Sequence, residues 1–97
     1  MKVVALLVAY NRRDLMLQTL DALAAQTRPV DAILVVDNAS TDGSGAAARS
    51  HRSHPEVLTL SRNTGGAGGF AAGLAHAAFS LAAGAVWLMD DDTAPEP

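Results

Sequence analysis

Four short apolar runs limit the possible folds of this chain more than any other feature of its sequence. They cover residues 3–9, 33–36, 57–60 and 85–89. The apolar residues in each run are continuous rather than alternating with polar ones, and three of the runs are rich in Val, Leu or Ile. Strands that are covered on both faces have this pattern, which is typical of parallel sheets. The runs therefore predict a parallel sheet with helices on both sides.

Helical patterns fill the segments between these runs. Asp14 is predicted as the N-cap of a helix over 15–26, and Arg28-Pro29 would end that helix. The turn over 40–43 leads into a short helix over 46–50. The third helix is indicated by an apolar stripe of Phe70, Leu74, Ala77 and Leu81. The order β-α-β-α-β-α-β predicts an α/β fold with a doubly wound sheet. At this length, residues 1–97 form one small domain at most, or a piece of a larger one.

Composition excludes several classes of protein. The 97 residues are 49% hydrophobic and 18% charged, which indicates a globular chain rather than a disordered one. Seven Lys and Arg against ten Asp and Glu give a net charge of −3, so we expect no nucleic-acid partner. The absence of cysteine excludes disulfides and thiolate metal sites. No apolar run approaches the ~20 residues of a transmembrane segment, and the first run is interpreted as a strand rather than a signal peptide.

Polar residues follow each of the four predicted strands. The strands are followed in turn by Tyr10-Asn11-Arg12, Asp37-Asn38, Arg62-Asn63 and Asp90-Asp91-Asp92. In open α/β sheets, ligands bind just outside the carboxyl ends of the strands. Because parallel strands bring these ends to one edge, the sequence predicts a ligand site there.

Three adjacent carboxylates at 90–92 indicate a divalent metal ion. Alternate side chains of an extended segment share a face, so Asp90 and Asp92 can converge on one ion. Carboxylate oxygens suit Mg²⁺ or Mn²⁺. A solvated acidic loop is the alternative for such a run, but its position directly after a buried strand favours the metal.

Asp37 and Tyr10 are the candidates for contacts with a nucleoside. A carboxylate at a strand end can accept hydrogen bonds from a base or a ribose, and an aromatic ring can stack on a base. The alternative for Tyr10 is an aromatic residue at the edge of the core. We assign Asp37 to the ligand, and the three residues Ser40, Thr41 and Asp42 to capping the helix that follows.

A glycine-rich segment over 63–70 is predicted as a loop that leads into the third helix. Its four glycines allow close approach of the backbone to a ligand, and a helix N-terminus favours an anion such as a diphosphate. Residues 66–71 also satisfy a relaxed dinucleotide fingerprint, with acidic residues about twenty positions on. A module that binds NAD(P) is therefore an alternative, although four residues separate the glycines from the third strand, where the fingerprint has a tight turn.

Taken together, these segments resemble the family 2 glycosyltransferases of the GT-A fold. The matching segments are VAYNR at 8–12, VVDNASTDG at 35–43, NTGGAGGF at 63–70 and WLMDDD at 87–92. The glycine segment paired with three Asp is most similar to the galactofuranosyltransferase and rhamnosyltransferase members, which build bacterial cell-wall or surface glycans. The resemblance implies the N-terminal, Rossmann-like part of a GT-A nucleotide-sugar-binding domain, with a mainly parallel sheet.

The resemblance also implies a role for each matching position. Tyr10 would stack on the donor base and Asp37 would bind it. Asp90 and Asp92 would hold Mn²⁺ or Mg²⁺, and Asp90 and Asp91 would contact the donor. The residues expected to line the nucleotide and diphosphate are Arg62, Asn63, Gly65 and Gly66. The donor would be a UDP- or dTDP-linked sugar, transferred with inversion to a glycan or glycolipid acceptor.

Members of this family are considerably longer than 97 residues. The resemblance implies that the general base and the acceptor pocket come from beyond residue 97, so no catalytic base is assigned here. We therefore expect donor and metal residues in a chain that is inactive alone, and an inert stub is a further alternative. The expected location is cytoplasmic, at the inner face of the plasma membrane.

Overall fold

The computed structural model describes residues 2–25 and 30–90. Seven elements alternate along this part of the chain in the predicted order. They are β1 (Val3–Ala9), α1 (Arg13–Ala24), β2 (Ala32–Asp37), α2 (Ser44–Arg49), β3 (Glu56–Thr59), α3 (Gly65–Phe79) and β4 (Ala85–Asp90). No helix in the described ranges is long and apolar enough to cross a membrane.

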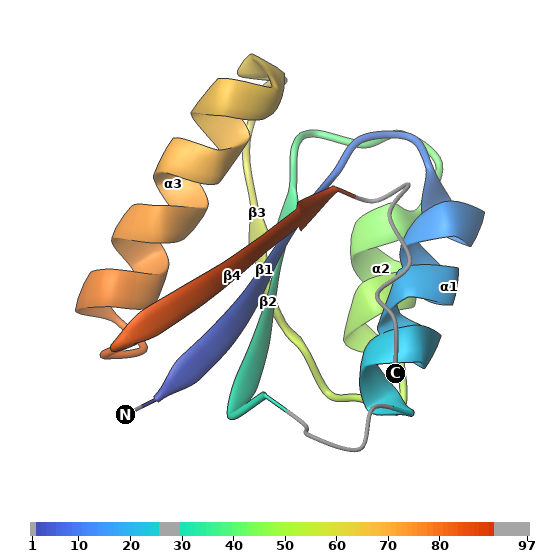
Figure 1. The fold of residues 1–97 in the computed structure, drawn as a ribbon. Coiled ribbons are helices and arrows are strands. Elements are labelled where there is room, and N and C mark those ends of the chain that lie inside the picture. The colour runs from blue at the N-terminus through green and yellow to red at the C-terminus, as the bar shows by residue number, and fades with distance from the viewer. Residues whose placement is uncertain (1, 26–29, 91–97) are drawn as a thin grey trace.

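The four strands form one parallel sheet in the order β3-β2-β1-β4 (Figure 1). The register pairs Ala9 with Asp37, Asp37 with Thr59, and Val8 with Asp90. The carboxyl ends of all four strands therefore lie at the same edge of the sheet. This arrangement confirms the predicted α/β fold, and it brings together the polar segments that follow the strands.

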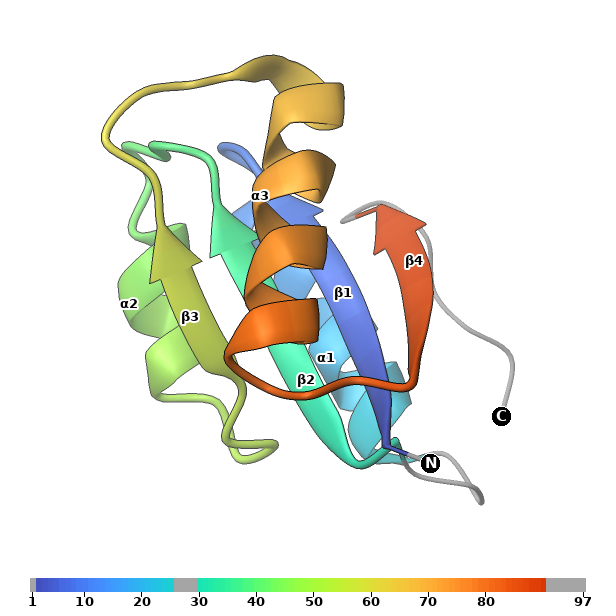
Figure 2. The same cartoon turned by 90° about the vertical axis from the view of Figure 1, so that its left-hand side faces the viewer.

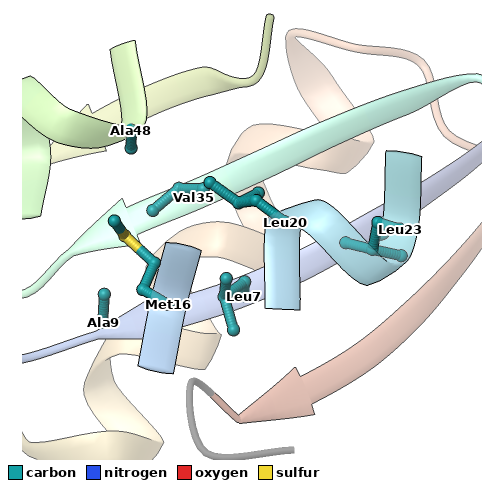
Figure 3. Packing of buried hydrophobic residues seen from close by; sticks show 8 residues of the cluster. Leu7, Ala9, Met16, Leu20, Leu23, Val35 and Ala48 are labelled. Atoms are coloured by element: carbon teal, nitrogen blue, oxygen red, sulfur yellow. The ribbon is translucent and has the colours of Figure 1, made fainter. Parts of the chain in front are cut away.

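Helices cover both faces of the sheet, as Figures 1 and 2 show. The α1 and α2 helices lie on one face, where Leu7 and Val35 of the strands pack with Met16 and Leu20 of α1 and with Ala48 of α2 (Figure 3). The α3 helix lies on the other face, over Val4, Leu6, Val8, Leu34 and Val36. Because β1 and β2 are covered on both sides, their apolar runs are continuous rather than alternating.

The α3 helix packs on the sheet through its smallest residues. A Cβ at Gly73 would lie 2.4 Å from Leu6 Cδ1 and 2.9 Å from Val36 Cγ2, and one at Gly69 would lie 2.7 Å from Val8 Cγ1. Ala77 continues this face and is fully buried. The absence of larger side chains therefore sets how closely the helix approaches the strands.

The predicted stripe on α3 was partly wrong. Phe70 and Leu81 pack against the core as expected, but Leu74 is 41% exposed. Residues 69, 73 and 77 face the sheet. Leu74 is one position further along the helix than Gly73, so its side chain points away from that face. The prediction selected large apolar residues, whereas the close approach of the helix excludes them from the contact.

The ends of the first two helices also differ from the prediction. The N-cap of α1 is Arg12, and Asp14 lies inside the first turn rather than at the cap. A carboxylate there still interacts favourably with the helix dipole. The α2 helix begins at Ser44, two residues earlier than expected, after Gly43 in the left-handed conformation with φ +83°. The predicted stop at Arg28-Pro29 lies outside the described residues.

Candidate functional site

Hydrogen bonds join the loops that follow β1 and β2. The Asn11 side chain accepts a bond from the Thr41 N–H at 2.7 Å, and the Asn11 N–H donates to Ser40 Oγ at 3.0 Å. Asn11 has a positive φ of 49°, which Asn tolerates better than most residues. These bonds fix the spacing of the two loops at the carboxyl edge, so Ser40 and Thr41 connect loops rather than cap α2.

Asp37 ends β2 and is 5% exposed. Its Oδ1 accepts the Ser40 N–H at 2.9 Å. A Cβ at Gly45 would lie 2.5 Å from Asp37 Oδ2, so the first turn of α2 leaves room for this carboxylate because residue 45 is glycine. The residue predicted to bind a ligand therefore also holds the turn after β2.

Asp42 joins the same network from the start of α2. Its Oδ2 accepts the Arg13 N–H at 3.0 Å, and its Oδ1 accepts the Ser44 N–H at 3.0 Å and the Ser44 hydroxyl. Partial burial raises the pKa of Asp42, but these hydrogen bonds outweigh burial and hold the pKa below its ordinary value. Asp42 therefore stabilises the starts of both α1 and α2, a wider role than the predicted capping of α2.

Asn38 is a structural residue that the sequence interpretation did not select. It is 2% exposed and lies directly after β2. Its Oδ1 accepts the Thr64 N–H at 2.9 Å and the Thr64 hydroxyl at 3.2 Å, and its Nδ2 donates to Gly65 O at 3.0 Å. Asn38 thus fastens the start of α3 to the end of β2. Its position after a buried strand was the available signal, but a strand-end Asn is more often exposed.

The glycine-rich segment is helical rather than a loop, which corrects the sequence interpretation. The α3 helix begins at Gly65, where φ is +76°, and Asn63 Oδ1 accepts the Gly65 N–H at 2.8 Å. The N-terminus of α3 is therefore at the carboxyl edge, and the positive end of a helix dipole favours an anion. The fingerprint glycines over 66–69 lie inside the helix, and residues 60–64 separate β3 from it, which disfavours the dinucleotide alternative.

The remaining predicted residues lie around this edge. Tyr10 directly follows β1 and is 44% exposed. Arg62 is exposed in the segment between β3 and α3. Asp90 is the last residue of β4, beside Val8 of β1. Asp91 and Asp92 lie outside the described residues, so their place in the site stays a prediction.

A metal ion at this edge would need carboxylate ligands from the end of β4 and from the residues that follow it in the sequence. Within the described residues, no group of three or more His, Asp or Glu is arranged to hold an ion. The first of the carboxylates predicted to hold the ion is Asp90, the last described residue. It ends β4 and lies at the carboxyl edge. Carboxylate oxygens beside a proposed diphosphate site fit Mg²⁺ or Mn²⁺, which share their coordination with phosphate groups.

Two hollows lie at opposite edges of the sheet. One of about 320 Å³ is at the carboxyl edge, lined by residues 11–15 and Asp42. A larger one of about 510 Å³ is at the amino edge, and its lining includes Leu23 and Ala24 at the end of α1. The negative end of the α1 dipole disfavours an anion there. The smaller hollow lies at the edge where the helix N-termini favour one.

The sequence matches the profile described as Glycosyl transferase family 2 over residues 5–97. Two curated relatives are named galactofuranosyltransferase GlfT1. The one from Mycolicibacterium smegmatis is 40% identical over 93 residues, which is 96% of this chain and 30% of the relative. The one from Mycobacterium tuberculosis is 45% identical, covering 93% of this chain and 30% of the relative. The chain thus spans about 30% of the length of these relatives.

Two solved structures have a similar fold. The mannosyltransferase PcManGT from Pyrobaculum calidifontis, in complex with GDP-Man and Mn²⁺, has a TM-score of 0.79 and 26% identity. The match covers 99% of this chain and 29% of that protein. Residues 1–349 of S. aureus TarS have a TM-score of 0.78 and 27% identity, with 97% of this chain and 28% of that protein covered.

Proposed function

The chain belongs to glycosyl transferase family 2, and we propose that it carries the donor-binding edge of an enzyme that transfers a sugar from a nucleoside diphosphate to an acceptor hydroxyl. One observation carries the proposal. Four parallel strands end at one edge of the sheet, beside the N-terminus of α3. That edge combines an aromatic ring, carboxylates, a cation and a helix N-terminus, which are the groups that bind a nucleoside diphosphate.

Each group has a proposed role in holding the donor. The half-exposed ring of Tyr10 stacks on the base. Asp37 accepts a hydrogen bond from an N–H of the base, since each carboxylate oxygen can accept two bonds and Ser40 uses one. Arg62 and Asn63 line the nucleotide and the diphosphate.

The diphosphate is proposed to lie at the start of α3. Gly65 and Gly66 let it approach the backbone there, and the helix dipole favours its charge. Asn38 keeps this helix end in register with β2 through its bonds to Thr64 and Gly65. A diphosphate and a base could therefore be bound at the same time by the α3 start and the β2 end.

Asp90 and Asp92 would hold a divalent metal, and Asp90 and Asp91 would contact the donor. The similar mannosyltransferase PcManGT is in complex with GDP-Man and Mn²⁺, which supports a divalent ion as a partner of this chain. The bound ion would supply positive charge that stabilises the diphosphate leaving group. The acceptor hydroxyl would then attack the anomeric carbon from the opposite face, with inversion.

The names of the relatives support a more specific proposal. Both curated relatives are galactofuranosyltransferases, so we propose galactofuranose as the sugar, carried by a UDP or dTDP donor to a glycan or glycolipid of the bacterial cell wall. The general base and the acceptor pocket are proposed to come from outside these 97 residues. The reaction would take place on the cytoplasmic side, at the inner face of the plasma membrane.

Calorimetric titration of UDP, dTDP and GDP into the chain, with and without Mn²⁺, tests this proposal, and NADH serves as the control ligand. We expect one nucleoside diphosphate to bind in the presence of the metal, and Asp92→Ala to abolish that binding. Asp14→Ala is the matched control, because it removes an exposed carboxylate near the same edge. Binding of NADH without metal would replace the proposal with the dinucleotide module, and binding of no ligand would indicate the inert stub.

A further inference from the structure

A second charged side chain, that of Arg49, lies close to Asp37. Arg49 is the last residue of α2, which lies beside β3 (Figure 2). Side chains of a helix tilt toward its N-terminus, so the guanidinium of Arg49 reaches back toward the carboxyl edge. There its Nη2 donates to Thr59 Oγ1 at 2.8 Å. Thr59 ends β3 and pairs with Asp37 in the register of the sheet, so Arg49 is held next to the end of β2.

Gly45 leaves a space that Asp37 and Arg49 share. Gly45 and Arg49 are about one helical turn apart and therefore lie on the same face of α2. From the position that a Cβ of residue 45 would take, Asp37 Oδ2 is 2.5 Å away and Arg49 Nη1 is 3.4 Å away. A carboxylate oxygen and a guanidinium nitrogen are thus neighbours on one side of the helix. Because residue 45 is glycine, it places no side chain between them.

Both charged groups keep unused hydrogen-bonding capacity. In the part of the chain that the structure describes, the Asp37 carboxylate accepts only the Ser40 N–H, through Oδ1, and the Arg49 guanidinium donates only to Thr59. A guanidinium has several N–H groups, so most of them remain available. No buried side-chain oxygen or nitrogen of the described residues lacks a partner, so Asp37 Oδ2 is open to solvent. An acceptor and several donors therefore face a space that a ligand can reach.

We propose that Arg49 and Asp37 together select a lactam base in the donor, namely uracil, thymine or guanine. A lactam has a ring N–H directly beside a C=O. The Asp37 carboxylate accepts the N–H, and the Arg49 guanidinium donates to the carbonyl oxygen. The two roles cannot be exchanged, because a carboxylate only accepts hydrogen bonds and a guanidinium only donates them. This inference rests on the proposed function and adds Arg49 to the residues that contact the base.

The same pair of groups disfavours the bases that are not lactams. The corresponding ring nitrogen of cytosine or adenine has a lone pair instead of a hydrogen, and that lone pair would face the Asp37 carboxylate. The amino group of these bases is a weaker donor than a lactam N–H. Hydrogen bonds to charged groups are the strong ones, so the loss of one weakens binding about tenfold or more. The site should therefore prefer a lactam base by at least about this factor.

Calorimetric titration of matched nucleotides in the presence of Mn²⁺ tests the selection of the base. UDP and CDP differ only in the base, as do dTDP and 5-methyl-dCDP, and GDP and ADP. In the pair that binds most tightly, we expect the lactam member to bind about tenfold or more tightly than its partner. Equal affinities within every pair would overturn this inference but not the proposed function. Binding of none of these nucleotides would overturn both.

An Arg49 variant separates a contact with the base from a purely structural role. Arg49→Met keeps a long side chain but donates no hydrogen bond. We expect it to weaken binding of the lactam nucleotide about tenfold and to leave binding of the matched partner unchanged, so that selectivity falls about tenfold. A loss of affinity by the same factor for both nucleotides would show that Arg49 only supports α2. That result, or wild-type affinity for both, would overturn the proposal.

Two further variants serve as controls, and urea unfolding checks that each of them folds. Arg52 is also exposed, but it lies 3.6 Å from Asp21 and lines the hollow at the amino edge. Arg52→Met should therefore bind both nucleotides as the wild-type chain does. Thr59→Val removes the contact between α2 and β3 but keeps the guanidinium, so it should be more selective than Arg49→Met. Equal loss of selectivity in Thr59→Val and Arg49→Met would contradict a direct contact between Arg49 and the base.

Discussion

Replacing Asn38 with Ala should lower the free energy of unfolding by about 2 kcal/mol. Each of the three lost hydrogen bonds contributes about 0.5–1.5 kcal/mol, and water replaces part of this contribution. The three bonds join the side chain to the N–H and hydroxyl of Thr64 and to the carbonyl of Gly65. Asn38 is 2% exposed, so its loss also leaves a small cavity. Thr64 and Gly65 are exposed and can bind water instead, which limits the cost.

Asn63→Ala is the matched control for this prediction. Asn63 contacts the same helix start, but it is exposed and accepts a single bond from the Gly65 N–H. Its removal should cost roughly 0.5–1 kcal/mol. Urea unfolding at one protein concentration, followed by circular dichroism, measures both variants. With a slope of about 1–3 kcal/mol per molar, Asn38→Ala should lower the midpoint by about 1 M. A midpoint equal to that of Asn63→Ala would refute the proposed fastening of α3 to β2.

Three further predictions concern the glycines and the carboxylates. Gly73→Val should destabilise the chain by about 1–3 kcal/mol in urea unfolding because it overpacks the contact between α3 and the sheet, whereas Ala75→Val on the exposed side should cost roughly 0.5 kcal/mol. Because hydrogen bonds lower the pKa of Asp42, its stabilising effect is complete above its ordinary pKa of 3.8 and disappears as pH falls through the lower folded value; Asp42→Asn should therefore flatten the loss of stability in acid unfolding curves. Gly45→Ala places a Cβ 2.5 Å from Asp37 Oδ2 and should weaken nucleoside diphosphate binding about tenfold in calorimetry, the loss of one charged hydrogen bond.

The order of elements could be predicted because β1 and β2 are buried on both faces. Short, continuous apolar runs are typical of strands in this position, and the right order of strands and helices follows from them. The meeting of the polar segments at one edge was predictable for the same reason, since parallel strands end together. The pairing of Asp37 with Ala9 and of Asp90 with Val8 confirms it.

The details of α3 could not be predicted from local preferences. Glycine has a low helix propensity, so the segment from Gly65 to Gly69 was expected to be a loop. In the structure, close packing of Gly69 and Gly73 on Val8 and Leu6 requires glycine in the helix. Tertiary contacts outweigh propensity here. The same packing explains why Leu74, the largest residue of that turn, faces away from the sheet.

The structural roles of the polar residues were also hidden in the sequence. Asn38 and Asp37 are neighbours, and both could have been assigned to a ligand by residue type. Successive side chains of an extended chain point to opposite sides. Asn38 therefore bonds to the start of α3, whereas Asp37 bonds to the turn before α2. The role of Asn38 depends on a contact with a residue more than 20 positions away, which no local pattern contains.

Paramagnetic broadening by Mn²⁺ in the presence of a nucleoside diphosphate tests most directly whether the carboxyl edge binds the donor. The seven residues of β1 span about 20 Å, so backbone amide signals at the two edges of the sheet are distinguishable by NMR. We predict broadening at Tyr10, Asn38 and Gly65, sharp signals at Asp31 and His54, and loss of the effect in Asp92→Ala. Broadening centred on Asp31 and His54, at the larger hollow of the amino edge, would contradict the account.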